Sequence, residues 1–167
     1  MKTIFNKTIL VVTLLSIVLL GCKKKEEEPE PTPTPTPTTY NFTAKVDGVD
    51  YKSSNGKAQI MSGILLISAT KDNDEFSFVF NLWYDSIQVK TYQYGSAMNN
   101  GQYAKAEYNI TSAQADYEAS SPVITDKFTV TKFDKSAKKI SGTFNFTGIH
   151  DGNQKVITEG TFTDLTW

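Results

Sequence analysis

From Tyr40 to the C-terminus, hydrophobic and polar residues alternate with a period of two, which is typical of β-strands and not of helices. The clearest alternation places five large apolar residues on one strand face: Phe76, Phe78, Phe80, Leu82 and Tyr84. Shorter alternating segments cover residues 42–46, 49–51, 58–61, 64–69, 87–94, 103–110, 127–133, 140–146 and 156–162. The pattern therefore predicts about ten short strands, with the phenylalanine face in the core.

Turn sequences between these segments define hairpins. Asp47-Gly48, Ser62-Gly63 and Asp151-Gly152 are dipeptides that favour tight turns with positive φ. Residues 64–69 are apolar on both faces, which predicts a central strand, and residues 111–118 predict a short helix or a loop. Many short strands joined by turns predict one all-β domain over residues 40–167, an antiparallel β-sandwich or a lipocalin-like barrel.

The chain begins with a different pattern. Two lysines precede an apolar segment, residues 9–20, which is too short to cross a hydrocarbon core of ~30 Å as a helix and has the size of a signal-peptide core. It ends in Leu19-Leu20-Gly21-Cys22, which contains the only cysteine. Residues 1–21 resemble a bacterial lipoprotein signal with its lipobox, which implies cleavage before Cys22, a lipid on its sulfur and acylation of its amino group. An ordinary signal peptide with an incidental cysteine is the alternative.

Residues 22–39 predict a disordered tether, because five of the six prolines lie there and exclude helix and sheet. An alternating Pro-Thr run favours extended polyproline II at ~3.1 Å per residue, so the tether spans roughly 50 Å. The Lys and Glu residues at 23–28 resemble the charged segment of Bacteroidota lipoproteins that reach the cell surface. The resemblance implies an outer-membrane lipoprotein held by its lipid anchor at the cell surface, and a periplasm-facing lipoprotein is the alternative.

Composition limits the chemistry. The 17 basic residues are all lysine, against 18 acidic residues, so the net charge is −1 and no basic patch for nucleic acid is expected. One cysteine and one histidine, His150, supply no zinc ligand set, and no serine lies in a G-x-S-x-G context. We therefore expect no metal, no cofactor and no enzymatic activity. A glycoside-type hydrolase is an alternative, because its two carboxylates need to be close only in space.

Exposed aromatic residues are the best binding candidates. Trp83 lies on the face opposite the phenylalanines, and three tyrosines, Tyr92, Tyr94 and Tyr103, flank a polar loop. The loop and its border add the amides of Asn99, Asn100 and Gln102. Rings that stack while amides donate would bind a glycan, a peptide or a protein. The same aromatic residues would alternatively pack in a two-sided core, or line a barrel mouth in a carrier of a small apolar ligand.

Two further resemblances rest on short motifs. Asp85-Ser86-Ile87 resembles the pattern at which Bacteroidota O-glycosylate exported proteins, which implies a glycan on Ser86. The domain opens with FTAKVDG at residues 42–48 and closes with ISGTFNF at 140–146 and TEGTF at 158–162. It thereby resembles small Bacteroidota lipoproteins of unknown function over residues 40–167. The resemblance implies no catalytic residues, so the expected function is a lipid-anchored, non-catalytic binding or accessory module.

Overall fold

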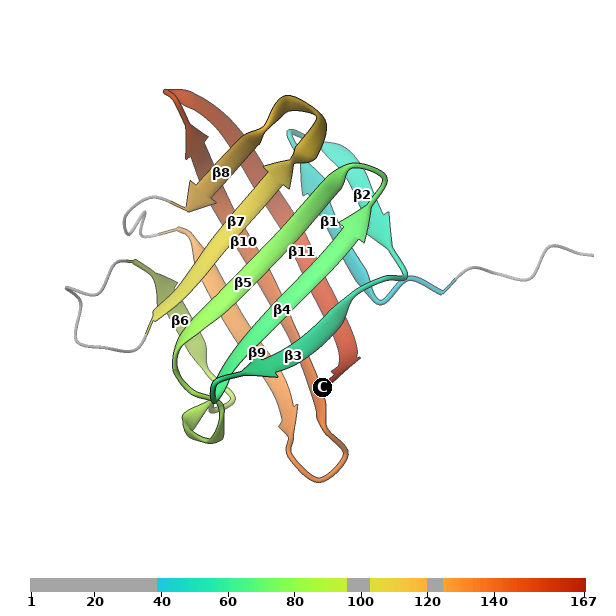
Figure 1. Ribbon diagram of the computed structural model, residues 1–167, viewed down its shortest axis with the longest axis vertical. Coiled ribbons are helices and arrows are strands. Elements are labelled where there is room, and N and C mark those ends of the chain that lie inside the picture. The colour runs from blue at the N-terminus through green and yellow to red at the C-terminus, as the bar shows by residue number, and fades with distance from the viewer. Residues whose placement is uncertain (1–38, 96–102, 120–124) are drawn as a thin grey trace, which may run out of the picture. The chain divides into compact units, whose positions relative to one another are not determined.

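The computed structural model describes residues 39–95, 103–119 and 125–167, which form an all-β domain without an α-helix in these ranges (Figure 1). Two 3-10 turns, η2 (Tyr84–Ser86) and η3 (Thr111–Ala113), are its only helical elements there. The strands are β1 (Phe42–Val46), β2 (Val49–Ser53), β3 (Lys57–Met61), β4 (Ile64–Lys71), β5 (Asp74–Trp83), β6 (Thr91–Tyr94), β7 (Tyr103–Ile110), β8 (Ala115–Ala119), β9 (Lys127–Asp134), β10 (Lys139–His150) and β11 (Asn153–Thr166). The predicted fold class is confirmed.

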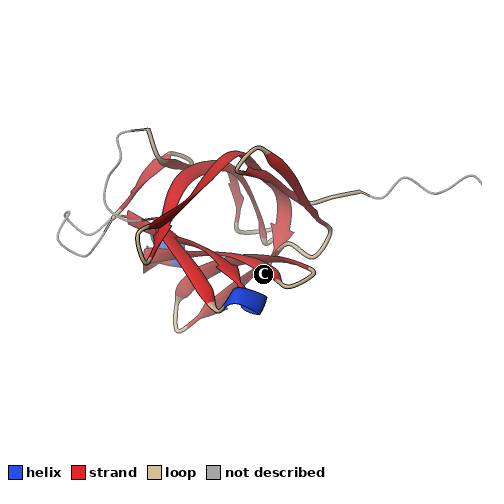
Figure 2. Ribbon diagram, turned by 90° about the horizontal axis from the view of Figure 1, so that it is seen from above, coloured by secondary structure: helices blue, strands red, loops and turns tan. Residues whose placement is uncertain are grey.

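All eleven strands belong to one sheet in the order β2-β1-β11-β10-β9-β6-β7-β5-β4-β3, and β8 pairs with β10 and β7. Seen from above, the strands surround a common interior (Figure 2). Side chains connect the two ends of the sheet: the Asn41 amide donates to the Gly56 carbonyl at 2.8 Å, and the Ser53 hydroxyl donates to the Thr70 carbonyl at 2.7 Å. The sheet is thus barrel-like, which is one of the two predicted architectures.

The predicted hairpins form with the expected backbone geometry. Asp47, Ser62 and Asp151 have φ angles of 50°, 51° and 46°, and the glycine that follows each also has positive φ. Two successive residues with positive φ match the right-handed twist of the flanking strands. One expectation was wrong: the sheet is not wholly antiparallel, because β6 runs parallel to β7 while it pairs antiparallel with β9.

Aromatic rings from two facing walls fill the interior. Phe76, Phe78 and Phe80 on β5 are fully buried, as the alternation predicts. The Phe78 ring lies 4.7 Å from the ring of Phe144 on β10 and 5.1 Å from that of Phe128 on β9. Burying a phenylalanine side chain stabilises a fold by roughly 1.5–3 kcal/mol, so this cluster is the main source of stability. Residues that alternate with these rings must point outward.

Two local expectations need correction. The segment predicted as a helix or loop contains the short turn η3 and then strand β8, which is held by pairing with β7 and β10. Strand β4 has a neighbour on each side but is not central, because only β3 separates it from the end of the sheet. The residues that make β4 apolar on both faces, Ile64 and Leu66, lie on its half-exposed outer side.

Strand β11 departs from simple alternation at two bulges. Glu159 and Asp164 have φ angles of 51° and 48°, and the register with β10 shifts near each. The buried residues of β11 are therefore unevenly spaced: Ile157, Gly160, Phe162 and Leu165. Val156 and Thr158 would share a face with Gly160 and Phe162 in an unbroken alternation, but the first two are exposed and the last two are buried. Each bulge adds one residue and reverses the facing of those on its other side.

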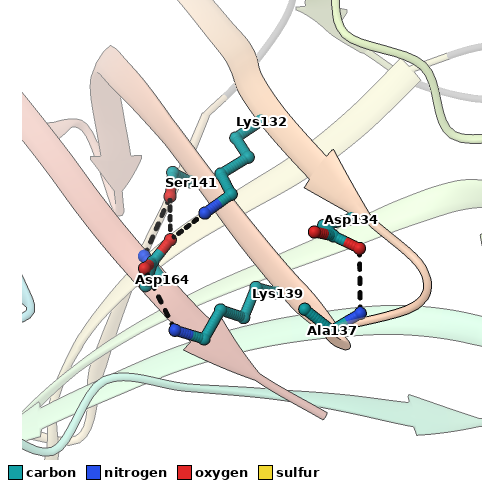
Figure 3. A network of polar contacts seen from close by, with 6 residues as sticks. All are labelled: Lys132, Asp134, Ala137, Lys139, Ser141 and Asp164. Carbon is teal, nitrogen blue, oxygen red and sulfur yellow. Dashed lines mark hydrogen bonds and ion pairs between the residues drawn. The ribbon is translucent and has the colours of Figure 1, made fainter.

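The Asp164 bulge is held by a polar network that joins three strands (Figure 3). The Asp164 carboxylate accepts hydrogen bonds from Lys132 of β9 at 2.8 Å and from Lys139 of β10 at 3.2 Å. Its backbone N–H donates to the Ser141 hydroxyl at 2.8 Å. The bonds from Lys132 and Lys139 lower the pKa of Asp164 to about 2, so the network is charged at neutral pH.

Candidate functional site

Trp83 ends β5 and points outward, with 65% of its surface exposed. Its ring lies over Gly63 in the β3–β4 turn, where an added Cβ would come within 2.1 Å of the ring. The backbone N–H of Tyr84 donates to the Gly63 carbonyl at 2.8 Å and fixes the turn against the end of β5. The absence of a side chain at residue 63 therefore lets the Cε3–Cζ3 edge of the ring pack against the turn, while most of the ring stays in solvent.

The register extends this exposed ring into an apolar surface. Ile64 pairs with Met61 on one side and with Trp83 on the other, and Met61 is 60% exposed. Leu66 pairs with Val79 farther along, after a register shift that leaves the exposed Asn81 of β5 between Val79 and Trp83. We call these five residues the Trp83 surface: Met61, Ile64, Leu66, Val79 and Trp83. An exposed tryptophan among half-buried aliphatic residues is typical of an interaction hot spot.

The following row changes character. Ser68 pairs with Lys57 on β3 and with Ser77 on β5, and Ser77 pairs with Glu107 on β7. The Trp83 surface is therefore apolar at one end of the β3–β5 wall and bordered by polar and charged residues along the same strands. A hydrophobic centre with a polar margin is the composition of a protein-binding surface.

Two of the predicted binding residues are not at the surface. Tyr92 and Tyr94 are each 1% exposed, and their hydroxyls donate to the carbonyls of Gln88 at 3.2 Å and Lys127 at 3.1 Å. Burial raises the pKa of both phenols. They occupy the inward positions of β6, so in this structure neither ring is exposed for stacking on a ligand. The residue exposed between them is Gln93.

Other predicted sites lie partly or wholly outside the described residues. Tyr103 begins β7, and its backbone pairs with Gln93, whereas Asn99, Asn100 and Gln102 fall outside the described ranges, as does Cys22. Ser86 ends η2 in an exposed position, and its hydroxyl lies 3.4 Å from the Asp85 carboxylate. Exposure is a requirement for glycosylation, which stays a prediction.

Carboxylates approach one another on the outer face of β7 and β8. Glu107 is directly opposite Glu118, and Lys105 forms ion pairs with both, at 3.9 Å and 2.6 Å. Burial is the main cause that raises the pKa of Glu107. The lysine thus lies between the two carboxylates and offsets part of their charge. In the described ranges, no group of three or more His, Cys, Asp or Glu residues is arranged to hold a metal ion.

His150 ends β10 beside a turn. Its Nε2 lies 3.7 Å from the Asp151 carboxylate, and its ring centre lies 5.6 Å from that of Tyr117. Asp151 is itself fully exposed in the turn. The histidine itself is half-buried, with 31% of its side chain exposed, and no serine or cysteine is among its described contacts.

A second surface feature could not be read from the sequence. The outer face of β9, β10 and β11 carries a shallow concavity of about 690 Å³. We call it the threonine groove; its lining residues are Lys127, Thr129, Thr143, Phe144, Asn145, Thr158, Glu159, Gly160 and Thr161. The groove depends on which residues of β9, β10 and β11 pair across the strands. That pairing depends on the positions of the bulges, which no local sequence pattern predicts.

Comparison with family models places residues 38–166 in a single family, the domain of unknown function DUF6252. The chain belongs to this family. No curated protein and no solved structure matches it. No relative therefore supplies site residues for this domain, and its candidate site rests on the geometry of its own residues. Within its described ranges, no helix is long and apolar enough to cross a membrane.

Proposed function

We propose that this DUF6252 protein is a Bacteroidota lipoprotein of the outer membrane, anchored through Cys22, whose domain is a non-catalytic binding module. The partner we propose is a protein or peptide that contacts the Trp83 surface. The observation that carries the proposal is the exposure of Trp83, which is 65% accessible although one edge of its ring packs against Gly63. Tryptophans in such positions dominate the binding energy of many interfaces.

The chemistry of the Trp83 surface supports a polypeptide partner. Met61 adapts its shape to irregular apolar partners, and Ile64 and Leu66 supply aliphatic contacts beside the ring. The amide of Gln59 and the ammonium of Lys57 lie at its margin, where they can donate hydrogen bonds to the backbone carbonyls and carboxylates of a partner. The sheet edge at β3 has only β4 as its hydrogen-bonded neighbour in the sheet order.

The remaining alternatives receive no such support. A carrier of an apolar ligand needs an interior cavity, whereas the described interior positions hold closely packed phenylalanine and tyrosine rings. A hydrolase needs two free carboxylates flanking a substrate, whereas Lys105 bridges Glu107 and Glu118.

The test uses the full chain, purified in a polyoxyethylene detergent, which carries no sugar. Random peptides displayed on phage are selected against it, and the selected peptides are measured with the wild type and with Trp83→Ala. We expect a loss of affinity of at least tenfold in the variant, which corresponds to about 1.4 kcal/mol. A glycan array probed with the same proteins serves as the second arm.

Val49→Ala is the matched control, because Val49 is an exposed apolar residue on β2, away from the Trp83 surface. It should bind the selected peptides as the wild type does. If no peptide is selected, or if Trp83→Ala and Val49→Ala lose the same affinity, the Trp83 surface is not the binding site. Circular dichroism of each variant confirms that it is folded.

A further inference from the structure

Five threonines form one continuous row across the sheet. Thr43 of β1 pairs with Thr161 of β11, Thr161 with Thr143 of β10, Thr143 with Thr129 of β9, and Thr129 with Thr91 of β6. Neighbouring strands lie ~4.8 Å apart, so the row extends roughly 20 Å. Its middle three members line the threonine groove.

The hydroxyls of this row differ in how they are used. At its ends they bond in pairs: Thr43 with Thr161 at 2.8 Å, and Thr91 with Thr129 at 2.9 Å. In the described part of the chain, neither Thr143 nor Thr158 bonds another protein group through its hydroxyl, although both line the groove. Each free hydroxyl can donate one hydrogen bond and accept two.

The shape of the groove comes from the first bulge of β11. Thr158 and Glu159 are both exposed, because the bulge places these two successive residues opposite a single position of β10, Asn145. Gly160 then points inward, where an added Cβ would come within 2.4 Å of the Phe144 ring. The outward side chains at the bulge thus form one wall of the groove, and Gly160, which has no side chain, leaves the floor at the level of the backbone.

The groove carries few charges. Lys127 contributes one ammonium, and Glu159 contributes one carboxylate that bonds Lys45 of β1 at 2.7 Å. A polyanion would be repelled by Glu159 and would find no arginine, since the chain has none. The other lining side chains are the buried ring of Phe144, the threonine hydroxyls and the amide of Asn145, whose nitrogen donates to the Thr125 carbonyl and whose oxygen remains an acceptor.

From this arrangement we infer that the threonine groove binds a neutral polysaccharide chain lying across β9, β10 and β11. A row of hydroxyls repeating at about the strand spacing of ~4.8 Å matches the repeat of hydroxyl groups along an extended pyranose chain. The groove is separate from the Trp83 surface: Phe78 and Phe144 meet in the core, so the outer faces of β5 and β10 lie on opposite sides (Figure 1).

The test is affinity electrophoresis of the full chain in gels that contain one soluble neutral polysaccharide each: laminarin, xyloglucan, galactomannan, arabinoxylan or dextran. Polygalacturonate serves as the anionic comparison. We expect at least one neutral gel to retard the wild type, and the double variant Thr143→Val/Thr158→Val to require at least a tenfold higher polysaccharide concentration. Valine keeps the shape and strand preference of threonine and removes only the hydroxyl.

Thr70→Val/Thr166→Val is the matched control, because both threonines are exposed on strands outside the groove. It should be retarded like the wild type, and so should Trp83→Ala, which separates this site from the Trp83 surface. The inference is overturned if no neutral gel retards the wild type, if polygalacturonate retards it more, or if both double variants behave alike. A groove variant that binds more tightly would also overturn it, since the contact would then be apolar.

Discussion

Phe78 and Val79 are adjacent on β5 and have opposite roles. Phe78 is fully buried among rings from β9 and β10, whereas Val79 lies half-buried on the outer wall within the Trp83 surface. The stability of the domain depends on the inward residue, whereas the outward one belongs to the surface that we propose for binding. Alternation along a single strand thus places a core residue beside a residue of the proposed binding surface.

Substitution of these two residues measures that separation. Phe78→Ala should lower the free energy of unfolding by roughly 3–5 kcal/mol, the range for emptying a buried aromatic site. Val79→Ala should cost clearly less, because it leaves no enclosed cavity. Urea denaturation of both variants gives the two values. Equal losses would show that the facing of β5 is not as described.

Residue positions were predictable where one alternation covers a whole strand, as in Phe76–Phe80. They were not predictable in β6, because alternation groups residues by strand face and does not show which face is the interior. Tyr92 and Tyr94 lie on the same face of β6, which is the interior face. A tyrosine is compatible with the surface or the core, because the hydroxyl of a buried ring can still donate to a backbone carbonyl. Trp83, by contrast, follows from its parity on β5, and the structure places it outward as expected.

Strand β11 shows that a bulge changes the shape of a strand and that side-chain bonds stabilise it. At Asp164 the extra residue is fixed by bonds to Lys132 and Lys139, which belong to the next two strands of the sheet. The bonds from Lys132 and Lys139 hold the pKa of the carboxyl at about 2. An aspartate in an unfolded chain has a pKa of about 3.9. The native state therefore binds fewer protons at this residue than the unfolded state does in the acidic range.

The sign of the resulting pH dependence follows from linkage. A lowered native pKa stabilises the fold above the unfolded pKa, and this contribution disappears as the pH falls from about 4 toward about 2. We expect Asp164→Asn to be less stable than the wild type at pH 6, and the difference to shrink on acidification. Urea denaturation at pH 6, 4 and 2.5 measures it.

Asp72→Asn is the control for this series, because Asp72 is exposed in the β4–β5 turn and forms no ion pair with a lysine in the described part of the chain. Its effect on stability should not follow that of Asp164→Asn. A difference between Asp164→Asn and the wild type that stays constant down to pH 2.5 would contradict the role assigned to the network.

Elements were predictable where local sequence specifies them. The hairpins at Asp47-Gly48 and Ser62-Gly63 follow from two residues each. Strand β8 was missed because its five residues gain their strand conformation from pairing with β7 and β10, which the local sequence does not encode. The bulges of β11 were missed for the same reason, and with them the row of threonines that depends on their register.

One core serves the whole domain. Its rings come from β1, β2, β5, β6, β7, β9, β10 and β11, and the edge strands β2 and β3 approach strands of the opposite end of the sheet. No cysteine occurs in residues 39–167, so neither a disulfide nor a thiol contributes to this core. Its stability should therefore be independent of any modification at Cys22, which precedes β1 by a proline-rich segment.

That independence predicts a clean separation of anchoring from folding. In cells labelled with a fatty acid, Cys22→Ser should lose the label and leave the membrane fraction, because a serine hydroxyl does not replace the lipid-bearing sulfur. The purified variant should unfold thermally at the temperature of the wild type. Ser54→Ala, an exposed change within the domain, should keep both the label and the membrane location. Labelled Cys22→Ser would refute the lipoprotein assignment, and a labelled wild type with a destabilised Cys22→Ser domain would show that the tether takes part in the fold.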